Sequence, residues 1–249
     1  MSTPLLAVER VCRSFGNFRA VNDVSFTLQS GGVTSIIGPN GAGKSTLFNM
    51  LSGSLRPSSG RVIVDGHDVT GTPPHRFAHL GIAKSFQITN VFPSLSVLEN
   101  VRIAVQARFG RLDPWTPRSR TPEFVERARG VLAMLGLSAR ADSRATALSH
   151  GQQRALEIAI ALAADPRLLL LDEPTAGMSP EESVEMMNLI RTLAVERTVV
   201  LVEHKMKLVM EISRRILVLH HGELLADGTA DEIRAHPDVQ AVYLGKGRT

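Results

Sequence analysis

The chain has 249 residues, of which 43% are hydrophobic, and its formal net charge is +4; this balance excludes a disordered or membrane-embedded chain and predicts a soluble, cytosolic protein. It carries one cysteine, Cys12, which excludes an internal disulfide and fits a reducing compartment. Its longest apolar runs, at 168–171 and 199–202, are far shorter than the roughly 20 residues of a membrane-spanning helix, and its first nine residues lack the pattern of a secretory signal.

The first third of the chain shows four strand patterns and one helix pattern. The strands are expected, in chain order, at 5–11, 21–28, 33–37 and within 55–66. The helix pattern covers 44–52, directly after a glycine-rich loop, and Gly53 would end it. This region therefore predicts a strand that runs through a loop into a helix, preceded by two further strands.

The middle of the chain, roughly residues 88–163, changes character, because it holds helix patterns and no convincing strand. The helices are expected at 97–105, 122–135 and 152–163. A proline-rich basic segment at 113–120 is expected to be a loop between the first two.

From residue 167 onward, strand and helix patterns alternate. The strands are expected at 167–172, 198–203 and 215–220, and the helices at 180–195 and 205–213. Alternation of this kind predicts a mainly parallel sheet covered by helices. The whole chain thus indicates an α/β core of the nucleotide-binding type that a helical segment interrupts.

Residues 38–46, Gly-Pro-Asn-Gly-Ala-Gly-Lys-Ser-Thr, match a phosphate-binding loop and lie between a predicted strand and a predicted helix. Glycines let the backbone curl with its N–H groups inward, and the helix start adds its positive end to the same anion. Lys44 is expected to reach the β- and γ-phosphates, and the Ser45 hydroxyl to ligate Mg²⁺. A glycine-rich turn that matches by chance is the alternative, and the flanking strand and helix disfavour it.

Four leucines at 168–171 are followed by Asp172 and Glu173. Ligand sites in open α/β sheets lie at the carboxyl ends of strands, so this pair is expected to face the phosphate loop. Asp172 is the predicted Mg²⁺ partner, and Glu173 is predicted to orient and polarise the attacking water as a general base. The alternative is a strand that ends in a solvated acidic turn.

A third motif, Leu-Ser-His-Gly-Gln-Gln at 148–153, narrows the class. Ser149 would cap a helix that starts near Gly151, and a hydroxyl, a glycine N–H and a helix N-terminus together make a second anion site. The motif resembles the Leu-Ser-Gly-Gly-Gln signature of the ABC ATPases and precedes the acidic strand as it does in that family. The resemblance implies a head-to-tail dimer that sandwiches ATP between the phosphate loop of one copy and Ser149, Gly151 and Gln152 of the other.

The other motifs of the ABC family appear in order. Gln87 stands where the family has a glutamine that approaches Mg²⁺, and His204 where it has the switch histidine that contacts the γ-phosphate. Phe15 stands where an aromatic residue stacks on adenine, and the resemblance adds Val21 to the nucleotide site. Taken alone, His204 would more often be a structural hydrogen-bonding residue and Phe15 a core residue.

These motifs define one set of predicted site residues. The residues assigned to ATP are Phe15, Val21, Asn40, Gly41, Ala42, Gly43, Lys44, Ser45, Thr46, Ser149, Gly151 and Gln152. The residues assigned to catalysis are Glu173, His204 and Lys44, and those assigned to Mg²⁺ are Ser45, Gln87 and Asp172.

Two positions depart from the family pattern. His150 stands where the signature usually has glycine, and Ser179 stands where many members have aspartate in the loop after the acidic strand. The departure at Ser179 concerns the coupling of the two sites rather than ATP binding, and some importer ATPases have aromatic or polar residues at the position of His150.

The resemblance covers nearly the whole chain and implies its architecture. The implied fold is α/β, a P-loop NTPase core of the RecA-like type with a mainly parallel sheet, an antiparallel β N-terminal subdomain and a helical insertion lobe. A single ATPase domain is expected over 1–249, in which 1–87 and 164–249 form the nucleotide-binding core and 88–163 the helical signature subdomain.

The residues around His204 and the tail at 242–245 are similar to those of the branched-chain amino acid importer ATPases. This resemblance implies an ATP-binding and hydrolysing subunit that powers uptake of branched-chain or hydrophobic amino acids. The related importers of urea and short amides resemble the chain as well, and the export ATPases of the lipopolysaccharide type share its Tyr-Leu-Gly tail, so both remain alternatives.

The implied partners are two transmembrane permease subunits, a second ATPase subunit (self or paralogue) and, indirectly, a periplasmic or extracellular solute-binding protein. The implied location is the cytoplasmic face of the inner or plasma membrane, and no nucleic acid is expected. A chromosome-type ABC ATPase would carry a long coiled coil between Lys44 and Ser149, and no heptads occur there. A P-loop kinase or GTPase does not need the 148–153 motif, and a binding module without chemistry does not need Glu173 and His204.

Overall fold

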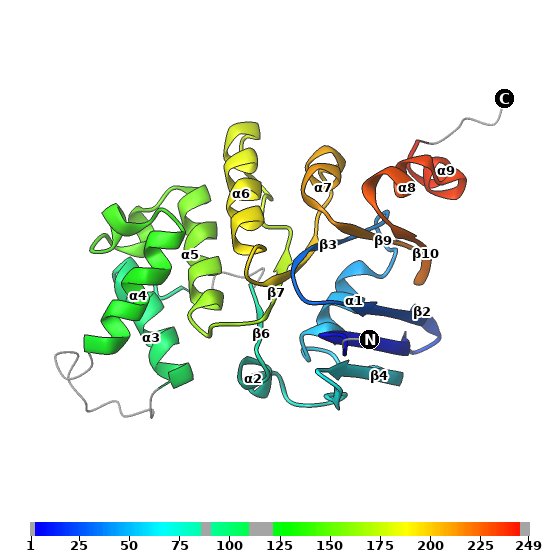
Figure 1. Ribbon diagram of the computed structural model, residues 1–249, viewed down its shortest axis with the longest axis horizontal. Coiled ribbons are helices and arrows are strands. Elements are labelled where there is room, and N and C mark those ends of the chain that lie inside the picture. The colour runs from blue at the N-terminus through cyan, green and yellow to red at the C-terminus, as the bar shows by residue number, and fades with distance from the viewer. Residues whose placement is uncertain (1–2, 86–90, 110–121, 245–249) are drawn as a thin grey trace.

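The computed structural model describes residues 3–85, 91–109 and 122–244 (Figure 1). A four-stranded antiparallel sheet in the order β2-β1-β4-β5 forms the N-terminal part of the core. Its strands are β1 (Leu6–Phe15), β2 (Phe18–Leu28), β4 (Ser59–Val64) and β5 (His67–Asp68). The first two reach further than predicted, because Arg13, Ser14 and Phe15 continue the pairing with β2 up to the shared turn.

A six-stranded sheet in the order β10-β9-β3-β8-β7-β6 carries the strands predicted to be parallel. Its strands are β3 (Gly32–Ile37), β6 (Ile82–Lys84), β7 (Leu168–Asp172), β8 (Thr198–Val202), β9 (Arg215–His220) and β10 (Glu223–Gly228). All neighbouring pairs are parallel except β9 and β10. The prediction of a mainly parallel core sheet beside an antiparallel N-terminal sheet is confirmed.

The four leucines of β7 pack against apolar residues on both faces of this sheet. Leu168 and Leu170 pack in one apolar cluster with α1 (Lys44–Leu51) and the N-terminal sheet. Leu169 and Leu171 pack in another cluster with α5 (His150–Leu162) and α6 (Pro180–Leu193). Because side chains alternate along a strand, a continuous apolar run is what a strand buried on both faces needs. The core therefore lies on both sides of β7, and the strand ends at Asp172.

The helices α3 (Val97–Phe109), α4 (Pro122–Met134) and α5 pack against one another on the far side of the molecule from β10 (Figure 1). Within the described parts of 91–163 there is no strand longer than an isolated bridge, as predicted. The division into 1–87, 88–163 and 164–249 stays a prediction, and its first boundary lies outside the described residues, as does the expected loop at 113–120.

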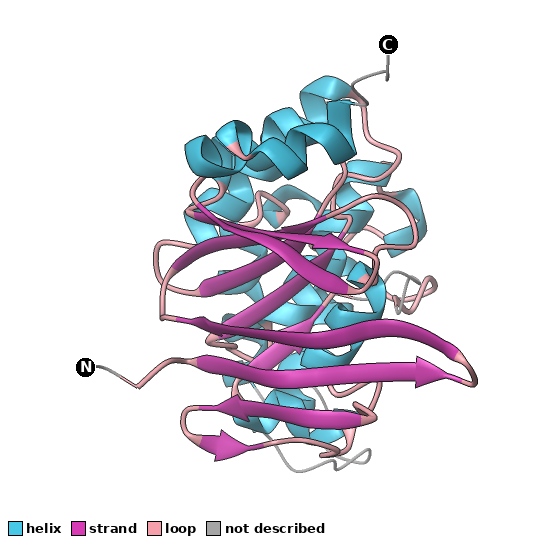
Figure 2. Cartoon of the chain, turned by 90° about the vertical axis from the view of Figure 1, so that its right-hand side faces the viewer, coloured by secondary structure: helices cyan, strands magenta, loops and turns pink. Residues whose placement is uncertain are grey.

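The remaining helices surround the core sheet, and Figure 2 shows the strands of both sheets with helices behind and above them. They are α2 (Pro74–Phe77), α7 (Met206–Ile212), α8 (Ala230–Ala235) and α9 (Pro237–Leu244). β5, β6, β10, α2 and α8 were not predicted; of these, β5, β6 and α2 have only two, three and four residues, too few to show a period of their own. In the described part of the chain, no helix has the length and apolar character needed to cross a membrane.

Candidate functional site

The phosphate loop joins β3 to α1, as predicted. Gly43 caps α1 with a φ of 98°, in the left-handed region that glycine favours. A Cβ atom at this position would lie 2.5 Å from the carbonyl oxygen of Ala20. The turn between β9 and β10 also holds the loop, because the N–H of Gly222 donates to the carbonyl of Ala42 at 3.0 Å. Both the backbone angle and the packing therefore require glycine at residue 43.

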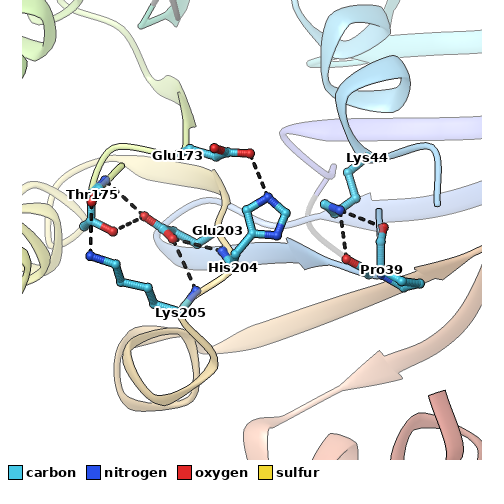
Figure 3. Close-up of polar contacts among 8 residues, drawn as sticks. Pro39, Lys44, Glu173, Thr175, Glu203, His204 and Lys205 are labelled. Carbon is cyan, nitrogen blue, oxygen red and sulfur yellow. Dashed lines mark hydrogen bonds and ion pairs between the residues drawn. The ribbon is translucent and has the colours of Figure 1, made fainter. Parts of the chain in front are cut away.

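Lys44 begins α1, and its buried side chain curls back over the loop (Figure 3). Its ammonium donates to the carbonyl oxygens of Gly38 at 2.8 Å and Pro39 at 2.9 Å. Burial lowers the pKa of Lys44, while the carboxylates of Glu173 and Asp172 oppose that shift. The ammonium is thus held at the mouth of the loop, where phosphate oxygens would be stronger acceptors than neutral carbonyls.

A cavity of about 260 Å³ opens above this loop. It brings together the predicted loop residues and both predicted catalytic residues from the ends of β7 and β8. Its lining consists of residues 40–46 with Phe18, Ala20, Glu173 and His204. Residues far apart in sequence thus converge on one space beside a helix N-terminus that no side chain of the described residues caps. This arrangement favours an anion.

The hairpin of β1 and β2 supplies the apolar side of the site. Phe15 is 48% exposed, and the guanidinium carbon of Arg13 lies 4.8 Å from its ring centroid, so its role as the adenine-stacking residue stays a prediction. Phe18, an aromatic residue beside the same turn, is 64% exposed and lines the cavity, a role that was not predicted from the sequence. Val21 is fully buried and would contact a Cβ atom at Gly43, so its side chain supports the loop; as a nucleotide contact it stays a prediction.

Asp172 ends β7 with a carboxylate that is 6% exposed. Its Oδ1 atom is buried without a hydrogen-bond partner among the described residues. Burial raises the pKa of Asp172, Lys84 opposes this shift, and Glu173 adds to it. A buried carboxylate oxygen without a donor fits a cation, and oxygen ligands of this kind suit Mg²⁺.

Replacing Asp172 with asparagine is expected to raise the stability of the fold. Because burial raises the pKa of this carboxyl above its unfolded value, ionised Asp172 costs stability at neutral pH, and the cost disappears as the pH falls through the raised pKa. Asp172→Asn removes the cost at every pH, and each gain of about 1 kcal/mol in stability raises Tm by about 2–4 °C in a chain of this size. Thermal unfolding without nucleotide or Mg²⁺ checks this: the variant should be the more stable at neutral pH, with a smaller difference in acidic buffer. A lower Tm for the variant at neutral pH would contradict it.

Glu173 and His204 form a direct pair (Figure 3). The Oε1 atom of Glu173 lies 2.7 Å from Nε2 of His204. The backbone of Glu173 has a φ of 47°, a strained value for a residue with a side chain, which costs of order 1–3 kcal/mol. Its N–H still donates to the carbonyl of Val202 at 2.8 Å. The structure thus aims a strained acidic residue and a histidine from neighbouring strands at the phosphate loop.

The second predicted anion site lies at the start of α5. The Ser149 hydroxyl accepts from the N–H of Gln152 at 3.3 Å, and the Gln152 side chain accepts from the N–H of Ser149 at 3.2 Å. This reciprocal capping box confirms the predicted cap. A cavity of about 450 Å³ beside it includes Ser149, Gly151 and Gln152 and shares no lining residue with the cavity at the phosphate loop. The two sites of one chain are therefore separate.

The two departures from the family pattern lie side by side. A Cβ atom at Gly177, in the loop after β7, would lie 3.1 Å from Cε1 of His150. Ser179 caps α6 in a second capping box with Glu182, and a Cβ atom at Gly151 would lie 3.1 Å from Oε1 of that glutamate. The starts of α5 and α6 therefore pack closely. Gln87, the third predicted metal ligand, lies outside the described residues.

Two family models match the chain. The one described as "ABC transporter" matches residues 21–176, and the one described as "Branched-chain amino acid ATP-binding cassette transporter" matches residues 223–249. The chain is 41% identical to the high-affinity branched-chain amino acid transport ATP-binding protein LivG of Salmonella typhimurium, over 99% of this chain and 100% of LivG.

Solved structures agree with these matches. An ATP-binding cassette of an ABC transporter in its ADP conformation superposes with a TM-score of 0.87 at 31% identity, covering 98% of this chain and 100% of the cassette. A dimeric cassette in a post-hydrolysis state, bound to ADP and Pi, superposes with a TM-score of 0.75 at 28% identity, covering 90% of this chain and 98% of the cassette.

Proposed function

This chain belongs to the ABC transporter family, and we propose that it is the ATP-hydrolysing subunit of an importer of branched-chain amino acids. The observation that carries the ATPase assignment is the shared cavity, in which Lys44 and the phosphate loop meet the Glu173–His204 pair. The likeness to LivG and the match over residues 223–249 support the substrate class.

The phosphates of ATP would lie in the loop, with Lys44 exchanging its two carbonyl acceptors for phosphate oxygens. Ser45 and Asp172 fit the role of Mg²⁺ ligands, and Gln87 is proposed as a third. When bound, Mg²⁺ would supply positive charge that neutralises the negative charge of the phosphate oxygens. The loop and Lys44 orient the terminal phosphate toward the end of β7.

Glu173 is proposed as the general base. His204 engages Oε1 of this carboxylate, so we assign Oε2 to the attacking water. Oε2 would accept the proton of this water as its oxygen bonds to the γ-phosphorus and the bond from that phosphorus to the bridging oxygen breaks, with ADP as the leaving group. The His204 ring, 2.7 Å from Oε1, is proposed to hold the carboxylate in line and to contact the γ-phosphate. Both carboxylate oxygens then have a defined partner.

A second copy of the ATPase, identical or a paralogue, is proposed to complete the site. In one chain the capped start of α5 and the phosphate loop open into separate cavities, so one γ-phosphate reaches both only if they come from opposite copies. The dimeric state of the related cassette supports this arrangement. Two permease subunits at the cytoplasmic face of the membrane and a solute-binding protein are the proposed further partners.

Reconstitution in liposomes tests the substrate class. The chain is purified with its permease subunits and its solute-binding protein, and uptake of labelled leucine is measured against labelled urea and acetamide, with ATP inside or outside the vesicles. ATP-dependent leucine uptake that stops with Glu173→Gln is expected. Uptake of only urea or acetamide would replace the amino-acid assignment with the amide alternative, and ATP-driven export would overturn import.

A further inference from the structure

Glu203 is a buried acidic residue that the proposed mechanism does not use. It directly follows the last residue of β8, Val202, and precedes His204, and it is 3% exposed. Burying a carboxylate is costly unless the protein supplies donors to it. The burial of Glu203 beside a catalytic residue therefore depends on the hydrogen-bond donors that reach its two carboxylate oxygens.

Each oxygen of Glu203 holds a different strand end (Figure 3). Its Oε1 atom accepts from the N–H of Thr175 at 3.0 Å and also from the Thr175 hydroxyl. Its Oε2 atom accepts from the N–H of His204 at 2.9 Å and from that of Lys205 at 3.4 Å. One carboxylate thus connects the loop after β7 to the loop after β8.

Lys205 adds a second connection between the same two loops (Figure 3). Its ammonium donates to the carbonyl of Thr175 at 3.1 Å and to the hydroxyl of Ser183 at 2.6 Å. Thr175 is fully buried, and its N–H, its hydroxyl and its carbonyl are all bonded to Glu203 or Lys205. The segment two residues after Glu173 is therefore held on both sides.

This restraint acts on the catalytic pair. Glu173 has a strained backbone, and strained conformations persist only when the surrounding structure over-determines them. Its 2.7 Å contact with His204 also requires the two strand ends to keep a fixed separation. Because Glu203 bonds to the backbone of His204 and to Thr175, it restrains both members of the pair.

We propose that Glu203 is a positioning residue that fixes the Glu173–His204 pair by joining Thr175 to the backbone of His204. Lys205 supports this connection through its own hydrogen bond to the carbonyl of Thr175. This inference rests on the proposed ATPase mechanism. Glu203 does not line the cavity at the phosphate loop, so its loss should affect turnover and leave nucleotide binding in place.

The test substitution is Glu203→Gln, with Glu157→Gln as the matched control. In glutamine, one carboxylate oxygen that accepts two hydrogen bonds is replaced by an NH₂ group, which accepts none, so one of the connections between the two loops is lost. Glu157 is also buried and bonded, to Arg154 at 2.7 Å, but it lies in α5 outside the cavity. Since a displacement of about 1 Å in an active site costs about 100-fold, kcat should fall about 10–100-fold in Glu203→Gln. The KM and the nucleotide affinity of Glu203→Gln should stay within about twofold of wild type. The activity of the control Glu157→Gln should also stay within about twofold.

A double-mutant cycle separates positioning from general stability. Residues that act as a unit show non-additive losses, so Glu203→Gln in a His204→Ala background should lower kcat by less than about threefold further. If Glu203→Gln does not fold, Thr175→Val removes one donor to the carboxylate and should lower kcat with KM unchanged. The inference is overturned by a kcat near wild type, by a loss no larger than that of Glu157→Gln, by a proportional rise in KM, or by additive losses in the cycle.

The same measurements distinguish this inference from the mechanism on which it rests. Hydrolysis by wild type together with its loss in Glu173→Gln tests the proposed ATPase. If both hold and Glu203→Gln behaves as wild type, only the positioning role fails. If Glu173→Gln still hydrolyses ATP at the wild-type rate, the proposed mechanism fails first.

Discussion

Glu173→Gln is expected to lower the rate of ATP hydrolysis by about 10²–10⁴-fold, the usual contribution of a general base. Glutamine keeps the shape of the side chain and its contact with His204, but it cannot take a proton from water. The phosphate loop and Lys44 are unchanged, so ATP still binds. Because the ATP that joins the two copies in the proposed dimer is no longer hydrolysed, the variant should accumulate as an ATP-bound dimer.

Steady-state hydrolysis and size-exclusion mass in Mg²⁺-ATP measure both effects. The matched control is Glu196→Gln, an exposed glutamate that pairs with Arg197 at 3.4 Å on the surface and should leave both readouts as in wild type. Turnover by Glu173→Gln within tenfold of wild type would remove Glu173 from the role of base. An inactive variant that stays monomeric with ATP would be consistent with Glu173 as the general base but would contradict the proposed ATP-bound dimer.

Lys44→Ala is expected to weaken binding of ATP itself. The ammonium is held at the mouth of the loop and donates to its carbonyl oxygens at 2.8 and 2.9 Å, so it already lies where it would donate to phosphate oxygens. A hydrogen bond to a charged group contributes about 1.5–3 kcal/mol, so its loss should raise Kd for ATP about 10–100-fold. Hydrolysis should fall at least as far, because the γ-phosphate loses its orienting cation.

Titration with a fluorescent ATP analogue measures this change in Kd. Lys207→Ala is the matched control, since Lys207 is an exposed lysine of α7 outside the cavity and its removal should not change Kd. An unchanged affinity in Lys44→Ala would contradict the assignment of residues 38–46 as the phosphate loop. A Kd raised equally in both variants would point to net charge rather than to this site.

The sequence alone identified the parts of the site that are local in the chain. The phosphate loop, the acidic pair at 172 and 173 and the cap at Ser149 each depend on neighbours a few residues away, so their spacing indicates both the element and the chemistry. The fold class followed for a similar reason, because the apolar run of β7 and the alternation after residue 167 report strands buried on both faces. The order of the motifs then identified the family.

Only the tertiary structure decided which strand ends meet. The order β3-β8-β7 sets Glu173 beside His204, although 31 positions separate them, and it brings Thr175 to the carboxylate of Glu203. The burial of Val21 beneath Gly43 likewise depends on how the N-terminal sheet packs against the loop. The short strand β6 is similar, since three residues gain their strand geometry from pairing with β7 rather than from a pattern of their own. Local spacing determines which residues can do the chemistry, and strand pairing decides which of them become neighbours. Strand pairing joins segments that are far apart in the chain, and no local sequence pattern specifies which segments pair.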